Sequence, residues 1–149
     1  MRMSSLFRLI HVINRCGGSY RAERLKKTDL GPNHHRYIFS VCRHPGISQE
    51  ELARRVYINK SNVTRHLTYL ESCGYVERKQ SSEDKRVILV YPTEKAIEVL
   101  PLLKSISQDW EKTVTEGFTE EELILFKSML TRVSARASEI FDNEVLKEE

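Results

Sequence analysis

Residues 60–68, with the sequence KSNVTRHLT, carry side chains that could read the edges of DNA base pairs. An arginine can fork onto guanine, an asparagine can pair with adenine through two hydrogen bonds, and serine or threonine can bond to either. The first turns of a helix that lies in the major groove reach the bases. The candidate base-reading residues are Lys60, Ser61, Asn62, Thr64, Arg65, His66 and Thr68. An ordinary solvated helix face is the alternative that this segment alone leaves open.

A second polar segment, QSSEDKR at residues 80–86, lies between segments 75–79 and 87–91, which read as strands. The segment is too long for a two-residue turn, so it predicts a β-hairpin with a charged tip. Basic side chains at such a tip can lie along phosphates or enter the minor groove. The candidate contacts are Ser81, Ser82, Asp84, Lys85 and Arg86. A plain solubilising loop is the alternative.

Two predicted helices place the candidate readers. Ser48, followed by Glu51 three residues later, forms a capping-box start for the first helix, whose buried stripe is Leu52, Ala53 and Val56. Asn59 can cap a second helix that begins at Lys60. The buried positions of this second helix, spaced i, i+4, i+7, are Val63, Leu67 and Leu70. Gly74 can adopt the left-handed conformation that ends it, so the pattern predicts a helix-turn-helix.

These segments resemble the MarR family of bacterial transcription regulators over about residues 31–96. The matching pieces are QEELA at 49–53, VTRHL at 63–67, LE at 70–71, GYV at 74–76, Arg78, and DKR at 84–86. The resemblance implies a winged helix-turn-helix flanked by helices that build an obligate homodimer. In the family the acid at Asp84 braces the hairpin and the arginine at Arg86 approaches DNA. The family often continues with Leu-Thr and a glycine, whereas PTEKA stands at 92–96, where Thr93 can still cap a helix.

The resemblance also implies control by a small aromatic or anionic effector. Such a molecule would bind where the dimer helices meet the DNA-binding lobe and would shift the separation of the two recognition helices. The candidate lining residues in this chain are His11, Asn14, Arg15 and Tyr37. Packing of these side chains is the alternative.

Helices flank this lobe on both sides. Leu6, Leu9, Ile10 and Ile13 form an apolar stripe in a helix predicted over about residues 4–27, where Gly17 and Gly18 suggest a kink or a close helix crossing. A helix after Thr93 contains Pro101, which should kink or interrupt it. Thr119 and Glu122 form a second capping box, with Phe118 available as its hydrophobic staple. The apolar positions of the last helix are Leu123, Phe126, Leu130, Val133, Ala137, Ile140 and Phe141.

This apolar surface exceeds what terminal helices without a covering layer can bury, so pairing with a second copy is expected. A monomer with a helical subdomain is the alternative. We expect a single domain over residues 1–149, with dimerisation helices at 1–30 and 93–149 and the DNA-binding lobe at 31–92. Two half-sites about one DNA turn apart would then make a pseudo-palindromic operator.

Composition agrees with a globular protein. The chain has 149 residues, is 40% hydrophobic and 30% charged, and contains no stretch long enough to span a membrane. Residues 1–92 carry 17 Lys/Arg and 8 Asp/Glu, whereas residues 93–149 carry 7 and 13. A basic first part is typical of a protein that meets a polyanion. Three widely spaced cysteines do not form a disulfide framework, and together with the absence of a signal peptide they indicate the cytoplasm.

Other chemistry is less well supported by the sequence. His34, His35, Cys42 and His44 lack the converging spacing of a zinc site, and both histidines near the helix start are expected at the surface. Cys16 lies next to Arg15, and an adjacent cation can lower a thiol pKa, so a redox switch at Cys16 is an alternative mode of regulation. We find no catalytic arrangement and expect neither an enzyme nor a cofactor.

The sequence therefore predicts a mainly α fold with a small β-hairpin (α+β), in which a winged helix-turn-helix is flanked by N- and C-terminal dimerisation helices. The predicted function is sequence-specific binding of double-stranded DNA by a homodimeric transcription regulator, a repressor released by a ligand. A thiol-based redox-sensing regulator of the same fold and a winged helix that binds a protein partner are the alternatives.

Overall fold

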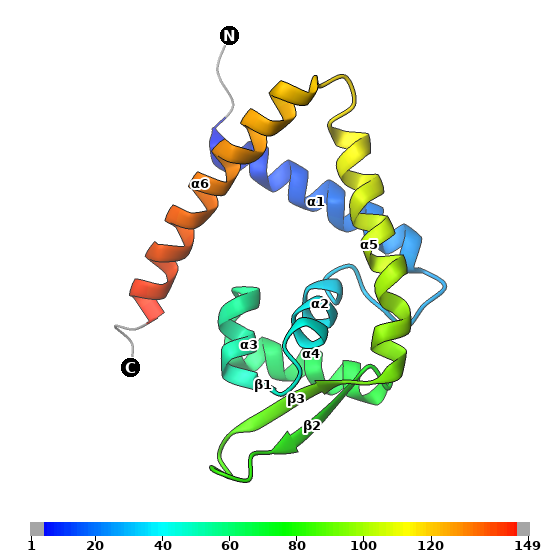
Figure 1. Ribbon diagram of the computed structural model, residues 1–149, viewed down its shortest axis with the longest axis vertical. Coiled ribbons are helices and arrows are strands. Elements are labelled where there is room, and N and C mark those ends of the chain that lie inside the picture. The colour runs from blue at the N-terminus through cyan, green and yellow to red at the C-terminus, as the bar shows by residue number, and fades with distance from the viewer. Residues whose placement is uncertain (1–4, 146–149) are drawn as a thin grey trace. The chain divides into compact units, whose positions relative to one another are not determined.

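The computed structural model describes residues 5–145, and the side chains of residues 5–141 among them. The predicted fold class is confirmed, because the chain is mainly helical and carries one small antiparallel sheet (Figure 1). Its elements are α1 (Leu6–Leu25), α2 (His35–Arg43), β1 (Ile47–Ser48), α3 (Gln49–Val56), α4 (Lys60–Ser72), β2 (Val76–Gln80), β3 (Ile88–Pro92), α5 (Glu94–Val114) and α6 (Glu120–Val145). The chain divides into two compact units, one ending at Trp110 and the other starting at Glu111. Within residues 5–145, no helix is both long and apolar enough to cross a bilayer.

The core of the first unit lies between α2, α3, α4 and the sheet. Tyr37, Ile38 and Val41 of α2 are fully buried. The stripes predicted for α3 and α4 are also confirmed, with Leu52, Ala53, Val56, Val63, Leu67 and Leu70 all buried. Burial of these apolar side chains fixes how α4 is presented, because its inner face is held by the core and its outer face is left to solvent.

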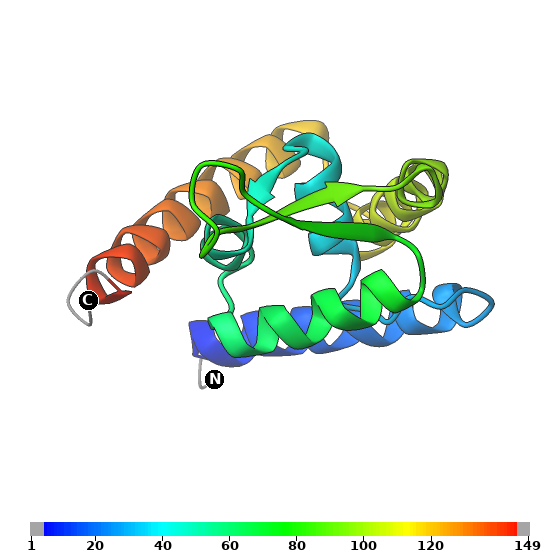
Figure 2. The same ribbon diagram turned by 90° about the horizontal axis from the view of Figure 1, so that it is seen from below.

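The sheet has three strands in the order β1-β3-β2, and both pairings are antiparallel. The predicted hairpin is β2–β3, in which Arg78 lies opposite Val90, and Figure 2 shows it from below. The sequence does not predict β1, because two residues are too few to display a strand pattern. Gly46, with a φ of +82°, places its N–H on the Val90 carbonyl at 2.9 Å and starts this third strand.

The predicted caps of the helix-turn-helix are confirmed. The Ser48 hydroxyl accepts the Glu51 N–H, and the Asn59 side chain accepts the Asn62 N–H. Gly74 adopts a φ of +77° where α4 ends. The turn between α3 and α4 holds Tyr57 at a φ of +55°, a left-handed conformation that a non-glycine residue adopts at a cost of roughly 1–2 kcal/mol.

Helices α1 and α5 cross closely at Gly17. A side chain at this position would meet the Trp110 indole at 3.3 Å, so the predicted close helix crossing is confirmed for Gly17. Helix α5 continues through Pro101, so the predicted interruption is wrong. Pro101 lies on the exposed side of the helix, where water can satisfy the freed carbonyl, while Ala96 and Leu103 are buried on either side of the proline and hold it in place.

Helix α6 belongs to the second unit. Its predicted capping box is confirmed in both directions, because the Thr119 N–H bonds to the Glu122 carboxylate at 2.8 Å and the Glu122 N–H bonds to the Thr119 hydroxyl at 3.2 Å. The Phe118 ring packs edge-on against Phe126, with centroids 5.8 Å apart. Large apolar side chains remain exposed along the helix, namely Ile124, Leu125, Phe126, Met129, Leu130, Val133 and Ile140.

Candidate nucleic-acid interface

The outer face of α4 gathers most of the predicted reading residues. Ser61, Thr64, Arg65 and Thr68 are exposed on this helix, and Asn62 is partly exposed. The Arg65 guanidinium donates to the Asn62 side-chain oxygen at 3.0 Å, one turn earlier on the helix. Figure 2 shows α4, in green, along its length beside the hairpin. The helix therefore presents hydroxyls, an amide and a guanidinium on one accessible surface.

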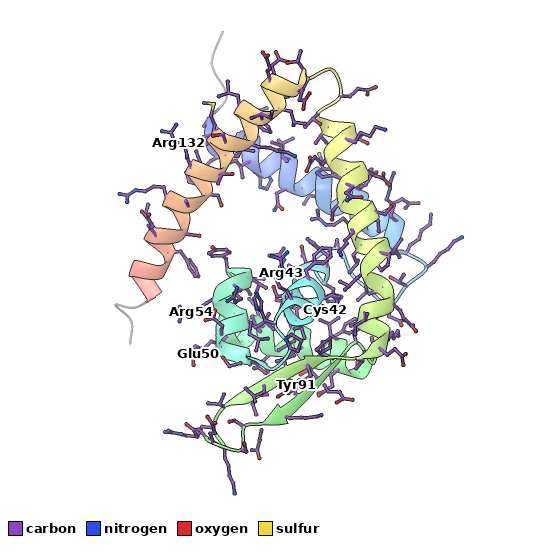
Figure 3. The ribbon with its side chains drawn as sticks, viewed as in Figure 1. Cys42, Arg43, Glu50, Arg54, Tyr91 and Arg132 are labelled. Carbon is purple, nitrogen blue, oxygen red and sulfur yellow. The ribbon has the colours of Figure 1, made fainter. Side chains whose placement is uncertain are left out.

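Helix α3 braces the start of α4 through two contacts that the sequence did not predict. The Gln49 amide donates to the Thr64 hydroxyl at 2.6 Å. The Lys60 ammonium pairs with the Glu50 carboxylate at 2.8 Å, and this ion pair lowers the pKa of Glu50. Glu50 is labelled on α3 in Figure 3. Because both contacts join residues more than nine positions apart, no local pattern in the sequence could reveal them.

The hairpin is fastened to α4 by Arg78 of β2. Its guanidinium donates to the Glu71 carboxylate at 2.7 and 3.0 Å and to the Thr68 hydroxyl at 3.1 Å. The same carboxylate also accepts the Arg78 backbone N–H at 2.9 Å. These hydrogen bonds lower the pKa of Glu71, so the carboxylate stays ionised. The pair fixes the hairpin relative to the outer face of α4.

The loop between β2 and β3 holds all five predicted wing residues. The Asp84 carboxylate accepts three hydrogen bonds from Arg86, one from its backbone N–H and two from its guanidinium, at 3.0 to 3.1 Å. The Ser81 hydroxyl accepts the N–H groups of Glu83 and Asp84. The side chain of Arg86 is 90% exposed, and Ser82 and Lys85 are exposed as well. The loop thus carries two accessible cations on a braced backbone.

His66 lies on a different side of α4 from these residues. Its ring lies 5.2 Å from the Tyr37 ring, and its Nδ1 lies 3.3 Å from Nε2 of His34. The structure therefore places His66 against α2 and the segment before it. The expectation that His34 is a surface residue is wrong, because His34 is only 8% exposed. It is buried because Tyr69 stacks on its ring and the Gly31 N–H donates to its Nδ1 at 2.9 Å.

These contacts define which nitrogen of the His34 ring carries the proton. Since Nδ1 of His34 accepts a hydrogen bond, the neutral ring carries its proton on Nε2 and donates it to His66. Burial, and after it the neighbouring His66, lower the pKa of His34 to about 4. Burial and the Arg21 guanidinium likewise lower the pKa of His35 to about 4. The rings of His34 and His35 therefore stay neutral in the folded chain near neutral pH.

We expect the free energy of unfolding to decrease as the pH falls from 6.5 towards 4. The folded pKa values lie below the ordinary value of 6.5, so the unfolded chain binds these protons more readily. The contribution of the two neutral histidines to the free energy of unfolding is fully present above pH 6.5. Between pH 6.5 and 4 it decreases by up to about 1.4 kcal/mol per pH unit for each histidine. Urea unfolding at several pH values measures it. His34→Gln, which keeps an acceptor for Gly31, should flatten the dependence, and an unchanged slope would contradict this assignment.

An open cleft of about 780 Å³ lies between α2, the turn after α3, and α5. Its lining mixes cations with apolar and aromatic side chains, namely Phe39, Ser40, Cys42, Arg43, His44, Arg55, Tyr57, Leu100 and Lys104. Cys42 and Arg43 are labelled on α2 in Figure 3. Burial raises the pKa of the Cys42 thiol, so this thiol is protonated at neutral pH. The chemistry of the lining suits a small molecule with a negative charge and an apolar part.

The residues predicted for an effector pocket do not line this cleft. Tyr37 is fully buried in the core, and its hydroxyl has no hydrogen-bond partner among the described residues. His11, Asn14 and Arg15 are exposed on α1. Cys16 is a free, exposed thiol on the same helix. Sequence reasoning missed the cleft because its walls come from three segments that are far apart in the chain.

Comparisons with known proteins agree on one family. A profile of the MarR family matches residues 28–87. The chain is 29% identical over 131 residues to the HTH-type transcriptional regulator YybA of Bacillus subtilis, a match that covers 88% of this chain and 87% of YybA.

Two solved structures extend this similarity to the helices that flank the profile match. A crystal structure of MarR superposes with a TM-score of 0.87 at 29% identity, over 94% of this chain and 95% of MarR. A MarR family regulator from Listeria monocytogenes, complexed with 26mer DNA, superposes with a TM-score of 0.85 at 27% identity, over 93% of both chains.

Proposed function

The chain belongs to the MarR family of transcriptional regulators, and from this membership we propose that it is a repressor that binds a pseudo-palindromic operator as a homodimer. The observation that carries the proposal is the outer face of α4 together with the hairpin. Arg65 and the other exposed polar residues of α4 suit base edges, and the exposed cations Lys85 and Arg86 suit phosphates or the minor groove. The ion pair between Arg78 of β2 and Glu71 of α4 fixes the position of the hairpin relative to the outer face of α4.

Selection of bound sequences from a random duplex pool by the purified protein tests this proposal. We expect enrichment of an inverted repeat whose half-sites are separated by about one turn of DNA, or about 10 base pairs. If that operator overlaps a promoter, addition of the protein should lower transcription in vitro. A pool that remains random, with only bulk binding that weakens with salt, would contradict an operator-specific function and favour a winged helix that serves a protein partner.

The homodimer is supported by exposed apolar surface on two separate helices. Helix α1 exposes Leu6, Phe7, Leu9, Ile10, Val12 and Ile13, and α6 exposes a further row of large apolar side chains. A row of large exposed apolar side chains along a helix is uncommon on a monomer and marks an interaction site. A second copy of the same chain would bury it, and it would bring a second recognition helix to the operator.

Release by a ligand is supported by the cleft. Arg43, Arg55 and Lys104 can attract an anion, while Phe39 and Leu100 can pack against its apolar part. The cleft also reaches Tyr57, the left-handed residue of the turn that joins α3 to α4. A ligand that favours one arrangement of this turn would change how α4 is presented to DNA, and its effect would equal its difference in affinity between the two arrangements.

We expect benzoate, used as an aromatic anion, to weaken operator binding about tenfold, within the range typical of coupled sites. Benzamide, which has the same shape but no charge, should have a much smaller effect. The double variant Arg43→Gln, Lys104→Gln should bind the operator with wild-type affinity and lose the response to benzoate. Lys112→Gln, on the same helix but outside the cleft, is the control and should respond normally. Fluorescence anisotropy of labelled operator measures all four cases, and a full response in the double variant would rule out this cleft.

A further inference from the structure

We propose that Thr64 and Thr68 read the 5-methyl groups of thymine through their own methyl groups, and that they do not read bases by hydrogen bonding. This inference rests on the proposed operator binding and specifies which base feature two of the readers recognise. It follows from what the two hydroxyls already bond to.

The hydroxyl of Thr64 is engaged on both of its sides. It donates to the Lys60 carbonyl at 3.0 Å and accepts from the Gln49 amide at 2.6 Å. A hydroxyl has one hydrogen to donate, and here the backbone takes it. Gln49 also takes one of the two acceptor sites of this oxygen. Thr64 is nevertheless exposed, so what it can still offer to a partner is its methyl and a single acceptor site, and it has no hydrogen left to donate to a base.

Thr68 repeats this arrangement one turn later. Its hydroxyl donates to the Thr64 carbonyl at 2.9 Å and accepts from the Arg78 guanidinium at 3.1 Å. Arg78 is held in turn by its paired hydrogen bonds to Glu71. Thr68 is also exposed. Gln49 and Arg78 are therefore positioning residues, because each binds a threonine hydroxyl and so orients the side chain that carries the methyl.

The two threonines lie on the same face of α4, four residues and about 6 Å apart along the helix axis. In the major groove, apolar contact with a threonine methyl is one way of recognising the thymine methyl. Two methyls in one row predict two positions in each half-site where thymine is preferred to cytosine because of its methyl group. Arg65 and Asn62 would read other base edges by hydrogen bonding.

Replacement of single thymines by deoxyuridine in the selected operator tests the proposal, since it removes one methyl and leaves the base pairing unchanged. We expect two positions in each half-site where the substitution weakens binding about fourfold. This factor corresponds to about 0.8 kcal/mol, the free energy of burying one CH₂ group. If no position responds while the operator is still selected, the methyl proposal fails and the proposed function stands. If no operator is selected at all, the proposed function fails first.

Two matched variants separate the methyl from the hydroxyl. Thr64→Val keeps a methyl and loses the hydroxyl, so it should retain the preference for thymine over deoxyuridine at one position. Thr64→Ser keeps the hydroxyl and loses the methyl, so it should bind both bases equally at that position and leave the other position unchanged. The reverse result, with discrimination kept by serine and lost by valine, would overturn the proposal. The same pair of substitutions at Thr68 should affect the second position.

Discussion

The double variant Leu130→Glu, Val133→Glu is expected to be monomeric and to bind the two-half-site operator at least about 100-fold more weakly than the wild type. Both side chains are exposed on the apolar face of α6 in the single chain. Two like charges on this face would oppose the burial that joins two copies. Linking two recognition units raises affinity by about 10² to 10⁴ through effective concentration, and a monomer loses that gain.

Sedimentation and operator titration measure the two parts of this prediction. Ala135→Glu is a control, because it places a glutamate on the opposite, exposed face of the same helix, although it adds one negative charge where the double variant adds two. It should remain dimeric and bind normally. The first unit of the double variant should keep its fold, which far-ultraviolet circular dichroism can verify. A double variant that stays dimeric, or a monomer with undiminished operator affinity, would contradict the proposed assembly.

Arg65→Ala is expected to weaken operator binding by about 1–3 kcal/mol, or roughly 5- to 150-fold, and to relax the preference at one base pair. The Arg65 guanidinium is exposed and bonded to Asn62 within its own helix. A surface hydrogen bond of this kind contributes little to the stability of the fold. The guanidinium can therefore give it up and bind the two acceptor atoms of a guanine instead. Repeating the sequence selection with the variant identifies the base position that it reads.

Two further variants separate base reading from charge. Arg65→Lys keeps the positive charge but cannot make the bidentate hydrogen bonds of a guanidinium, so it should lose most of the preference at the same base pair. Lys85→Gln, at the exposed tip of the hairpin, should weaken binding evenly across sequences. It should also reduce, by about one, the slope of the logarithm of the binding constant against the logarithm of the salt concentration. If Arg65→Ala leaves the selected sequence unchanged, the outer face of α4 is not the reading surface.

Local signals in the sequence were sufficient to predict the helix-turn-helix. Ser48, Asn59 and Gly74 act on backbone groups within four residues of themselves, so their types and positions define where α3 and α4 begin and end. The spacing of Val63 and Leu67 likewise identifies the buried face of α4 without knowledge of its neighbours. The outer face, and with it the set of candidate readers, followed from the same periodicity.

Features that depend on distant residues could not be predicted in this way. His34 is buried by Tyr69, which lies 35 positions further along the chain, and the sequence around His34 gives no sign of it. The bond from Gln49 to Thr64 depends on the crossing of two helices. Pro101 was expected to kink or interrupt α5, and the interruption does not occur, because packing of the residues on either side of the proline outweighs the local preference. The two-residue strand β1 exists only because β3 lies beside it.

The crossing at Gly17 gives this protein a natural optical reporter. The chain has a single tryptophan, and Trp110 lies against Gly17 and 5.0 Å from the ring of Tyr20. Emission from an indole responds to its solvent exposure and to its contacts. A displacement of α1 relative to α5, on effector or operator binding, would therefore change the intrinsic fluorescence of the unlabelled protein. Rearrangement at this crossing can thus be followed in real time without introducing a dye.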